Sequence, residues 1–166
     1  LTDTIVRQVH DMRRMVDEFS SFARMPKPTF GAEDIRDILR QSVFLFEVAK
    51  PDIQFSVRTP ADLEHVVCDR RLISQALTNI VKNAVEAIEE HVDPASIKPP
   101  IGHVRADVEL GEGGRLFLHI TDDGIGLPDQ REAIAEPYMT TRQGGTGLGL
   151  AIVKKIVEQH YGELDF

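Results

Sequence analysis

The chain has 166 residues, of which 42% are hydrophobic and 28% are charged, and its formal net charge at pH 7 is -8. This length fits one domain, or one domain with a small appendage, and the composition is too apolar for a disordered chain. The single cysteine, Cys68, excludes an internal disulfide framework and a multi-cysteine zinc site, and the acidic charge argues against broad binding to nucleic acid.

The first 25 residues predict a helix with one apolar seam. Its apolar residues recur at steps of four and three, as in a heptad pattern, and Pro26 and Pro28 end the helix near Met25. We interpret residues 1–27 as half of a helical hairpin or bundle whose partner helix is missing from this chain. The alternative is a long helix that folds back on its own domain. The seam consists of Ile5, Val9, Met12, Val16, Phe19 and Ala23.

The remaining residues, 28–166, predict one domain in which helices and strands alternate. An apolar stripe from Ile35 to Phe46 predicts a helix that ends before Pro51, and a second helix runs from its capping residue Asp69 to about Glu90. A last helix is expected from about Leu148 to His160. Strands are expected at 53–57, 66–68, 104–110 and 116–120, with a glycine turn at 111–114, a loop at 91–100, an irregular segment at 122–147 and the start of a strand at 163–166.

The long central helix carries an unusual polar face. Asn79, Asn83 and Glu86 are spaced at i, i+4 and i+7, so they share one face of the helix. Asparagine is a poor helix former, and neutral amide oxygens at this spacing suit a hard cation whose other ligands are phosphate oxygens and water. Judged from this helix alone, a solvent-exposed polar stripe is the favoured interpretation. The other faces carry Leu72, Ala76, Leu77, Ile80, Val81, Ala84 and Ile88.

The segment ITDDGIGLP places Asp122 at the end of a strand, and Gly124 and Gly126 follow it in D-x-G-x-G spacing. Glycines at these positions allow a tight turn and let a flat ligand approach the backbone closely. A carboxylate at the end of the strand can accept a hydrogen bond from an amino group such as that of adenine. Alone, the pattern is also typical of an ordinary Asp-Gly turn.

A second glycine-rich segment leads directly into the last helix. Its glycines are Gly144, Gly145, Gly147 and Gly149. Backbone amides at a helix N-terminus form an anion site suited to phosphate. The spacing matches neither G-x-x-x-x-G-K-[ST] nor G-x-G-x-x-G. A flexible linker is the alternative, but Thr146 and the amphipathic helix that follows favour a phosphate site.

Together the three clusters resemble the catalytic, ATP-binding domain of bacterial two-component sensor histidine kinases, within the GHKL or Bergerat superfamily. Residues 79–84 (NIVKNA) match the N box of that family, 122–126 (DDGIG) the first glycine box, 136–142 (EPYMTTR) the F box and 145–150 (GTGLGL) the second glycine box. The resemblance runs from about Phe30 to the last residue. Before it, MVDEFSSFARMPKP resembles the second helix of the dimerisation and phosphotransfer domain, most closely in nitrogen-regulation kinases of the NtrY type.

The resemblance implies an α/β fold of two layers, the Bergerat ATP-binding fold, in which helices cover one face of a mixed sheet and ATP lies between the helices and a mobile lid. It implies ATP and Mg²⁺ as ligands: Asn83 would bind Mg²⁺, Asp122 would select adenine and Arg142 would reach the phosphates. Related ATPases carry a glutamate at the position of Asn79 to activate water, and an amide cannot act as that base. We therefore expect Asn79 to act in positioning, with slow hydrolysis and transfer to a supplied nucleophile. The implied ATP-binding residues are Asn79, Asn83, Glu86, Asp122, Gly124, Gly126, Thr141, Arg142, Gly145, Thr146, Gly147, Leu148, Gly149 and Leu150.

The phosphoacceptor histidine is not expected in this chain. His10 lies in HDMRRM, which resembles the acceptor box H-E-x-x-N-P of the family, but the proline is missing and the helix stop at Pro26 follows too soon. We therefore expect the acceptor upstream, and the chain to be a fragment that also lacks the closing strands of the fold. The other histidines show no metal-ligand spacing; they are His65, His91, His103, His119 and His160.

The expected function is transfer of the γ-phosphoryl group of ATP to a histidine of the dimerisation domain, for relay to an aspartate of a response regulator. The expected partners are that domain, in a homodimer of the full-length protein, and the response regulator. The alternative is a nucleotide-binding regulatory module of the same fold, such as an anti-sigma-type serine kinase or a catalytically silent scaffold; the heptad helix argues against it. A clamp of the gyrase or chaperone class would carry glutamate at position 79.

The chain is expected to lie in the cytoplasm and to contact neither nucleic acid nor membrane. It contains no uncharged apolar run near the roughly 18 residues that a membrane helix needs, and its polar first residues differ from a secretory signal. In the resembling family a sensor domain usually precedes the hairpin, so a full-length protein anchored in the bacterial inner membrane is compatible with this expectation.

Overall fold

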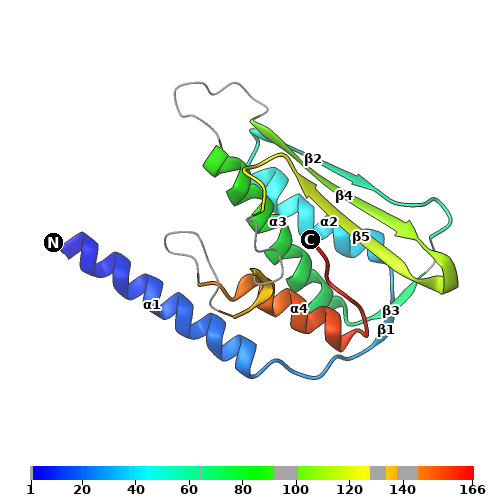
Figure 1. Ribbon diagram of the computed structural model, residues 1–166, viewed down its shortest axis with the longest axis horizontal. Coiled ribbons are helices and arrows are strands. Elements are labelled where there is room, and N and C mark those ends of the chain that lie inside the picture. Colours follow the sequence, from blue (N-terminus) through cyan, green and yellow to red (C-terminus); the bar gives the residue numbers. More distant parts are fainter. Residues whose placement is uncertain (1, 64, 92–100, 128–133, 138–145) are drawn as a thin grey trace. The chain divides into compact units, whose positions relative to one another are not determined.

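The computed structural model describes residues 2–63, 65–91, 101–127, 134–137 and 146–166 (Figure 1). The chain divides into two compact units: one is Thr29–Leu127, and the other combines Leu1–Pro28 with Pro128–Phe166. No helix in the described part of the chain has both the length and the apolar character that crossing a bilayer requires.

The unit Thr29–Leu127 is built on a mixed sheet of three strands in the order β2-β4-β5. Strand β2 (Ile53–Arg58) runs parallel to β4 (Gly102–Leu110), and β4 runs antiparallel to β5 (Leu116–Asp122). The predicted glycine turn joins β4 to β5 through the short helix η1 (Glu112–Gly114), where Gly113 and Gly114 have φ of 72° and 76°. Only glycine adopts this backbone conformation without strain. The three strands and their turn confirm the prediction.

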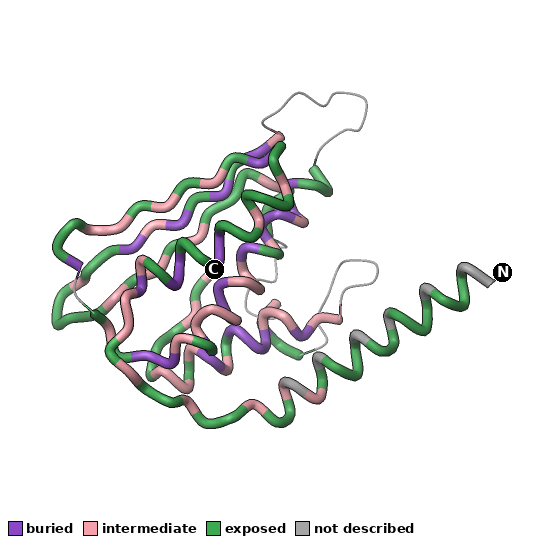
Figure 2. The backbone as a smooth tube through the Cα atoms, turned by 180° about the vertical axis from the view of Figure 1, so that it is seen from behind, coloured by how far each residue is buried: buried purple, intermediate pink, exposed green. Residues whose placement is uncertain are grey.

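Two helices cover one face of this sheet (Figure 1), namely α2 (Ile35–Ala49) and α3 (Arg70–His91). The predicted cap of α3 is confirmed, because the Leu72 main-chain N–H donates to Asp69 Oδ1 at 3.1 Å. The apolar faces of the helices and the inward side chains of the strands form the core. Less exposed and more exposed residues alternate along the strands (Figure 2), as expected for a sheet with one covered face. The least exposed core residues include Ile38, Leu39, Val81, Ile88, Val104 and Ala106.

Two local features differ from the sequence prediction. Strand β1 (Gly31–Glu33) is not predicted; it pairs antiparallel with β3 (Val66–Cys68) in a separate two-stranded sheet. Three residues are too few for an alternating pattern, so this strand depends on its partner. The prediction that a strand begins at 163–166 is wrong, because these residues are irregular and form no ladder with the described strands.

The other unit contains α1 (Thr2–Ala23) and α4 (Gly149–Gln159), close to the predicted bounds of both helices. The ammonium group of Lys155 donates to the Phe22 main-chain oxygen at 2.9 Å and lies 4.6 Å from the centre of the Phe22 ring. The seam of α1 is exposed, from 48% at Phe19 to 67% at Met12. The hairpin interpretation of residues 1–27, and the domain boundary after them, stay predictions.

Candidate functional site

The polar face predicted on α3 is half-buried. Asn79, Asn83 and Glu86 all have intermediate exposure, and the helix buries its apolar residues on its other faces. The face is therefore less exposed than the solvent-exposed stripe favoured from the helix alone, and its role as a cation site stays a prediction. Ile80, expected on the apolar side, is also only half-buried. Lys82 Nζ lies 3.8 Å from Glu86 Oε1, one helical turn away.

The carboxylate of Asp122 stabilises the turn of the loop that follows β5. Asp122 is the last residue of β5 and is exposed, and its Oδ1 accepts a hydrogen bond from the Gly124 main-chain N–H at 3.0 Å. This local bond directs the chain away from the sheet. Gly126 has φ of 78°, a conformation that strains other residues. The tight turn predicted from D-x-G-x-G is confirmed.

The second carboxylate of this loop holds β4. Asp123 Oδ1 accepts the His103 main-chain N–H at 2.7 Å, and Asp123 Oδ2 lies 2.9 Å from His103 Nδ1. Burial raises the pKa of Asp123, but the hydrogen bonds and the charge of His103 outweigh it and bring the pKa below its ordinary value. The loop therefore carries, next to Asp122, an ionised carboxylate with two contacts to His103.

The same loop packs against α3. The Ile125 main-chain N–H donates to the Ala87 main-chain oxygen at 3.2 Å. A Cβ atom at Gly124 would lie 2.5 Å from the carbonyl carbon of Ala87, so only glycine permits this approach. Because Ala87 follows Asn83 by one helical turn, the loop contacts the helix next to the predicted polar face. The structure thus brings two of the three sequence-predicted clusters to one place within Thr29–Leu127.

The third cluster belongs to the other unit. Gly147 has φ of 67°, Leu148 is completely buried, and α4 begins at Gly149. The hydroxyl of Thr146 accepts the Leu148 main-chain N–H at 3.4 Å. A Cβ atom added at Gly149 would meet no described atom within 4 Å outside its own helix backbone and its chain neighbours. Leu150, next along the helix, has intermediate exposure.

Three predicted residues, Thr141, Arg142 and Gly145, lie outside the described residues, as does most of the segment 136–142. Glu136 and Pro137 are exposed. Within the described ranges, no group of three or more His, Cys, Asp or Glu residues could hold a metal ion. The amide oxygens of Asn79 and Asn83 nevertheless fit a hard cation that takes its remaining ligands from phosphate and water. The donor set is thus compatible with a cation that arrives together with a nucleotide.

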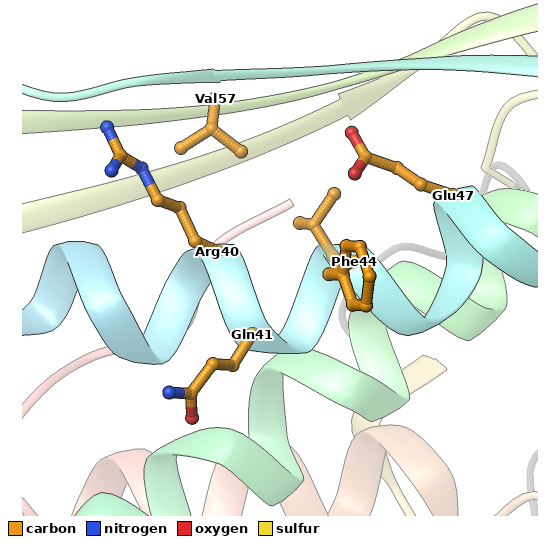
Figure 3. Close-up of a pocket in the computed structure, with 6 residues that line it drawn as sticks. Arg40, Gln41, Phe44, Glu47 and Val57 are labelled. Atoms are coloured by element: carbon orange, nitrogen blue, oxygen red, sulfur yellow. The ribbon is translucent and has the colours of Figure 1, made fainter.

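A depression of about 440 Å³ lies elsewhere on the unit Thr29–Leu127, between α2 and β2 (Figure 3). Phe44 lies between Arg40 and Glu47 along α2, and Val57 of β2 faces the helix. None of the residues that line it belongs to the predicted site, so the depression is separate from the residues described above. Its lining residues are Arg40, Gln41, Val43, Phe44, Glu47 and Val57.

Sequence reasoning missed His103, Gly102 and Ala87. A Cβ atom at Gly102 would lie 2.5 Å from Ile88 Cγ2 and 2.8 Å from Asp123 Oδ1, so a side chain here would displace one of these two side chains. Asp123 is the second residue of the D-x-G-x-G motif, a position to which the motif assigns no role. The strand register points to His103. Val104 lies opposite Asp122 in the ladder, so the next residues along the two strands, His103 and Asp123, come to lie across from each other.

Comparisons with known proteins agree with this architecture. Residues 68–166 match the family described as histidine kinase-, DNA gyrase B-, and HSP90-like ATPase. The chain is 51% identical over 167 residues to nitrogen regulation protein NtrY of Azorhizobium caulinodans. This alignment covers 99% of this chain and 21% of that protein. The chain therefore spans about a fifth of the length of this curated relative.

Two of the solved structures that are similar to the chain illustrate the likeness. A mycobacterial sensor histidine kinase, MprB, shows 27% identity and a TM-score of 0.66, with 80% of this chain and 81% of that chain covered. Full-length ShkA in complex with AMPPNP shows 28% identity and a TM-score of 0.76, with 94% of this chain and 33% of that chain covered. These likenesses confirm the predicted α/β fold class.

Proposed function

We propose that this chain, which belongs to the family of histidine kinase-, DNA gyrase B- and HSP90-like ATPases, is the ATP-binding catalytic domain of a sensor histidine kinase. In this function it binds ATP and delivers the γ-phosphoryl group to a histidine. The observation that carries the proposal is the docking of the loop Asp122–Gly126 onto α3 next to Asn83, in a chain half identical to an NtrY protein. The alternative of a regulatory binding module is not favoured, because other relatives of the chain are named sensor histidine kinases.

Each cluster takes one part of the nucleotide. The Asp122 carboxylate accepts a hydrogen bond from the adenine amino group, and Gly124 and Gly126 let the base approach the backbone. The segment Gly147 to Leu150 would present main-chain amides to phosphate oxygens, and Thr146, whose hydroxyl accepts the Leu148 N–H in the structure, lies beside it. Arg142 would reach the phosphates, and Glu86 would face the same pocket from the helical turn after Asn83. Thr141 and Gly145 complete the residues that we assign to ATP binding.

Asn83 is the residue that would hold Mg²⁺, with Asn79 beside it. The ion would neutralise charge on the phosphates, which is the main requirement of phosphoryl transfer. Because Asn79 carries an amide, it cannot take a proton from water. The site therefore positions ATP for an incoming nucleophile and hydrolyses it slowly.

In the transfer, an imidazole nitrogen of the acceptor histidine attacks the γ-phosphorus. A phosphorus–nitrogen bond forms, the bond from the γ-phosphorus to the bridging oxygen of the β-phosphate breaks, and ADP leaves. We assign the acceptor to a dimerisation domain of the same protein, in a homodimer, and not to His10. The subsequent acceptor is an aspartate of a response regulator. The chain acts in the cytoplasm, and an anchor in the bacterial inner membrane elsewhere in a full-length protein is compatible with this location.

The test is calorimetric titration with a non-hydrolysable ATP analogue in the presence of Mg²⁺. We expect micromolar affinity, about 8 kcal/mol at a dissociation constant near 1 μM, and weaker binding by Asn83→Ala. Glu89→Ala is the matched control, because Glu89 is exposed on the same helix and is not among the residues assigned to ATP. Unchanged affinity in Asn83→Ala would remove Asn83 from the site.

The transfer step needs a second experiment. The chain is incubated with labelled ATP, Mg²⁺ and a separate hairpin domain that carries an acceptor histidine. Acid-labile label on the hairpin supports a histidine kinase, because phosphohistidine hydrolyses in acid. Nucleotide binding without any labelled hairpin would instead support the regulatory binding module.

A further inference from the structure

The end of β5 is held on β4 by a side chain instead of a main-chain pair. The ladder between the two strands ends with Val104 opposite Asp122, although β4 begins two residues earlier, at Gly102. Beyond this last pair, Asp123 Oδ1 accepts the main-chain N–H of His103 at 2.7 Å, and Asp123 Oδ2 lies 2.9 Å from Nδ1 of the His103 ring. The carboxylate continues the contact between the strands while the chain turns away from the sheet.

Asp122 therefore lies between two fixed points. On one side is the bonded pair of Asp123 and His103, and on the other is the bond from the Ile125 N–H to the Ala87 oxygen on α3. Asp122 itself uses Oδ1 to accept from the Gly124 N–H, and among the described residues its Oδ2 has no protein donor. The direction of Oδ2 is thus set by a main-chain segment that these two points hold.

We propose that Asp123 and His103 form a positioning pair that orients the Asp122 carboxylate and thereby sets the preference of the site for adenine over guanine. The inference rests on the proposed function. Adenine carries an amino group at the position where guanine carries a carbonyl oxygen, so a carboxylate there attracts one base and repels the other. This discrimination depends on where the carboxylate oxygen lies. Neither Asp123 nor His103 needs to touch the nucleotide.

The geometry distinguishes this pair from a general stabilising contact. Side chains of Asp123 and His103 are 51% and 57% exposed, so the pair adds little buried surface. Exposed ion pairs contribute little to folding stability. Its consequence for the molecule is local, because the bonded carboxylate directly follows Asp122 in the chain.

The test compares affinities for ADP and GDP, measured by calorimetry with Mg²⁺ on folded protein. Asp123→Ala removes both bonds, and we expect roughly tenfold weaker ADP binding with GDP affinity changed less than about twofold. His103→Ala keeps the main-chain bond to Asp123, so we expect roughly a threefold loss for ADP. Asp123→Asn keeps an acceptor for the His103 N–H and should restore most of the preference.

His119→Ala is the matched control. It removes another exposed histidine of the same sheet, whose Nε2 lies 3.8 Å from a carboxylate oxygen of Glu109, and it should leave the ADP to GDP ratio unchanged. A purely structural role of the pair would lower the melting temperature of Asp123→Ala without changing that ratio, and this result overturns the proposal. If Asp123→Ala fails to fold, an unchanged ratio in His103→Ala overturns it equally. If the wild-type chain binds ADP and GDP with equal affinity, only this inference is contradicted. If it binds neither nucleotide, the proposed function is contradicted as well.

Discussion

At the scale of single residues, Asp69 joins three parts of the chain. Its carboxylate accepts the main-chain N–H groups of Thr29 and Leu72 at 2.8 and 3.1 Å, and its Oδ2 lies 3.6 Å from a guanidinium nitrogen of Arg71. Burial raises the pKa of Asp69, but these bonds and the Arg71 charge outweigh it and lower the pKa below the ordinary value. One residue thus caps α3 and holds the start of the unit Thr29–Leu127.

Asp69→Ala should lower the free energy of unfolding by about 2 kcal/mol at pH 7. Because the pKa in the folded state lies below the unfolded value of about 3.9, the carboxylate stabilises the fold above about pH 4. This contribution is lost as the pH falls from there toward the folded-state pKa. Urea unfolding at pH 7, 5 and 3 measures the difference between wild type and variant, which should shrink at pH 3.

Asp62→Ala serves as the control for this titration, since Asp62 is exposed. It should change stability by less than about 0.5 kcal/mol at each pH. A loss in Asp69→Ala that is the same at pH 7 and pH 3 would contradict the role assigned to the ionised carboxylate.

At the scale of elements, α3 serves the core and the candidate site at once. Its buried residues pack under the sheet, with Val81 and Ile88 at 0% and 1% exposure, while Asn79, Asn83 and Glu86 remain half-buried on another face. A helix used in this way has little freedom to move, because a shift that opens the site also disturbs the core. The loop after β5 adds a further contact through Ala87.

Ile88→Ala should destabilise the unit by about 2–4 kcal/mol, because it removes a fully buried side chain and leaves a cavity. Chemical denaturation measures the loss. Lys82→Ala, on the exposed side of the same helix, should change stability by no more than about 0.5 kcal/mol. Equal losses in both variants would show that the buried face is assigned to the wrong side.

Gly124→Ala should displace the loop from α3, because the new Cβ atom would lie 2.5 Å from the Ala87 carbonyl carbon, a backbone atom that cannot yield by rotating. We expect roughly tenfold weaker ADP binding, measured by calorimetry. Gly113→Ala is the comparison: Gly113 lies in the turn between β4 and β5, its Cβ meets open space, and the cost is backbone strain of about 1 kcal/mol at a positive φ. Similar nucleotide affinity in wild type and Gly124→Ala would show that the close approach is dispensable.

At the scale of the whole molecule, the chain combines elements with different structural demands. The unit Thr29–Leu127 has its own core between sheet and helices, whereas α1 leaves a long apolar seam exposed. Exposed apolar seams of this length commonly mark interaction surfaces. The predicted hairpin partner would cover that seam, in agreement with the proposed place of the chain in a larger kinase.

Nucleotide binding should stabilise the folded chain as a whole. At a concentration of ADP and Mg²⁺ one hundred times the dissociation constant, the gain is about 2.7 kcal/mol, which raises the melting temperature by several degrees. Asp122→Ala should lose this shift, because the adenine contact is removed. A thermal melt with and without nucleotide measures it, and a normal shift in the variant would place the base elsewhere.

The sequence by itself determined the features that depend on neighbouring residues. Prolines ended the first helix, Asp69 capped α3, and alternation or helical spacing located β2, β4, β5 and α4 within a few residues. The three motif clusters, and the family they indicate, also follow from short segments. These signals are local because turns, caps and amphipathic faces are determined over a few residues of chain.

Only the tertiary structure decided which of these segments meet. Strand β1 exists because β3 lies beside it, and the pairing of Asp123 with His103 requires the register of two strands that are separated in sequence. The docking of Gly124 on Ala87 likewise needs α3 to lie under the end of β5. Such contacts depend on packing among distant segments, and no local pattern of residues encodes a distance between them.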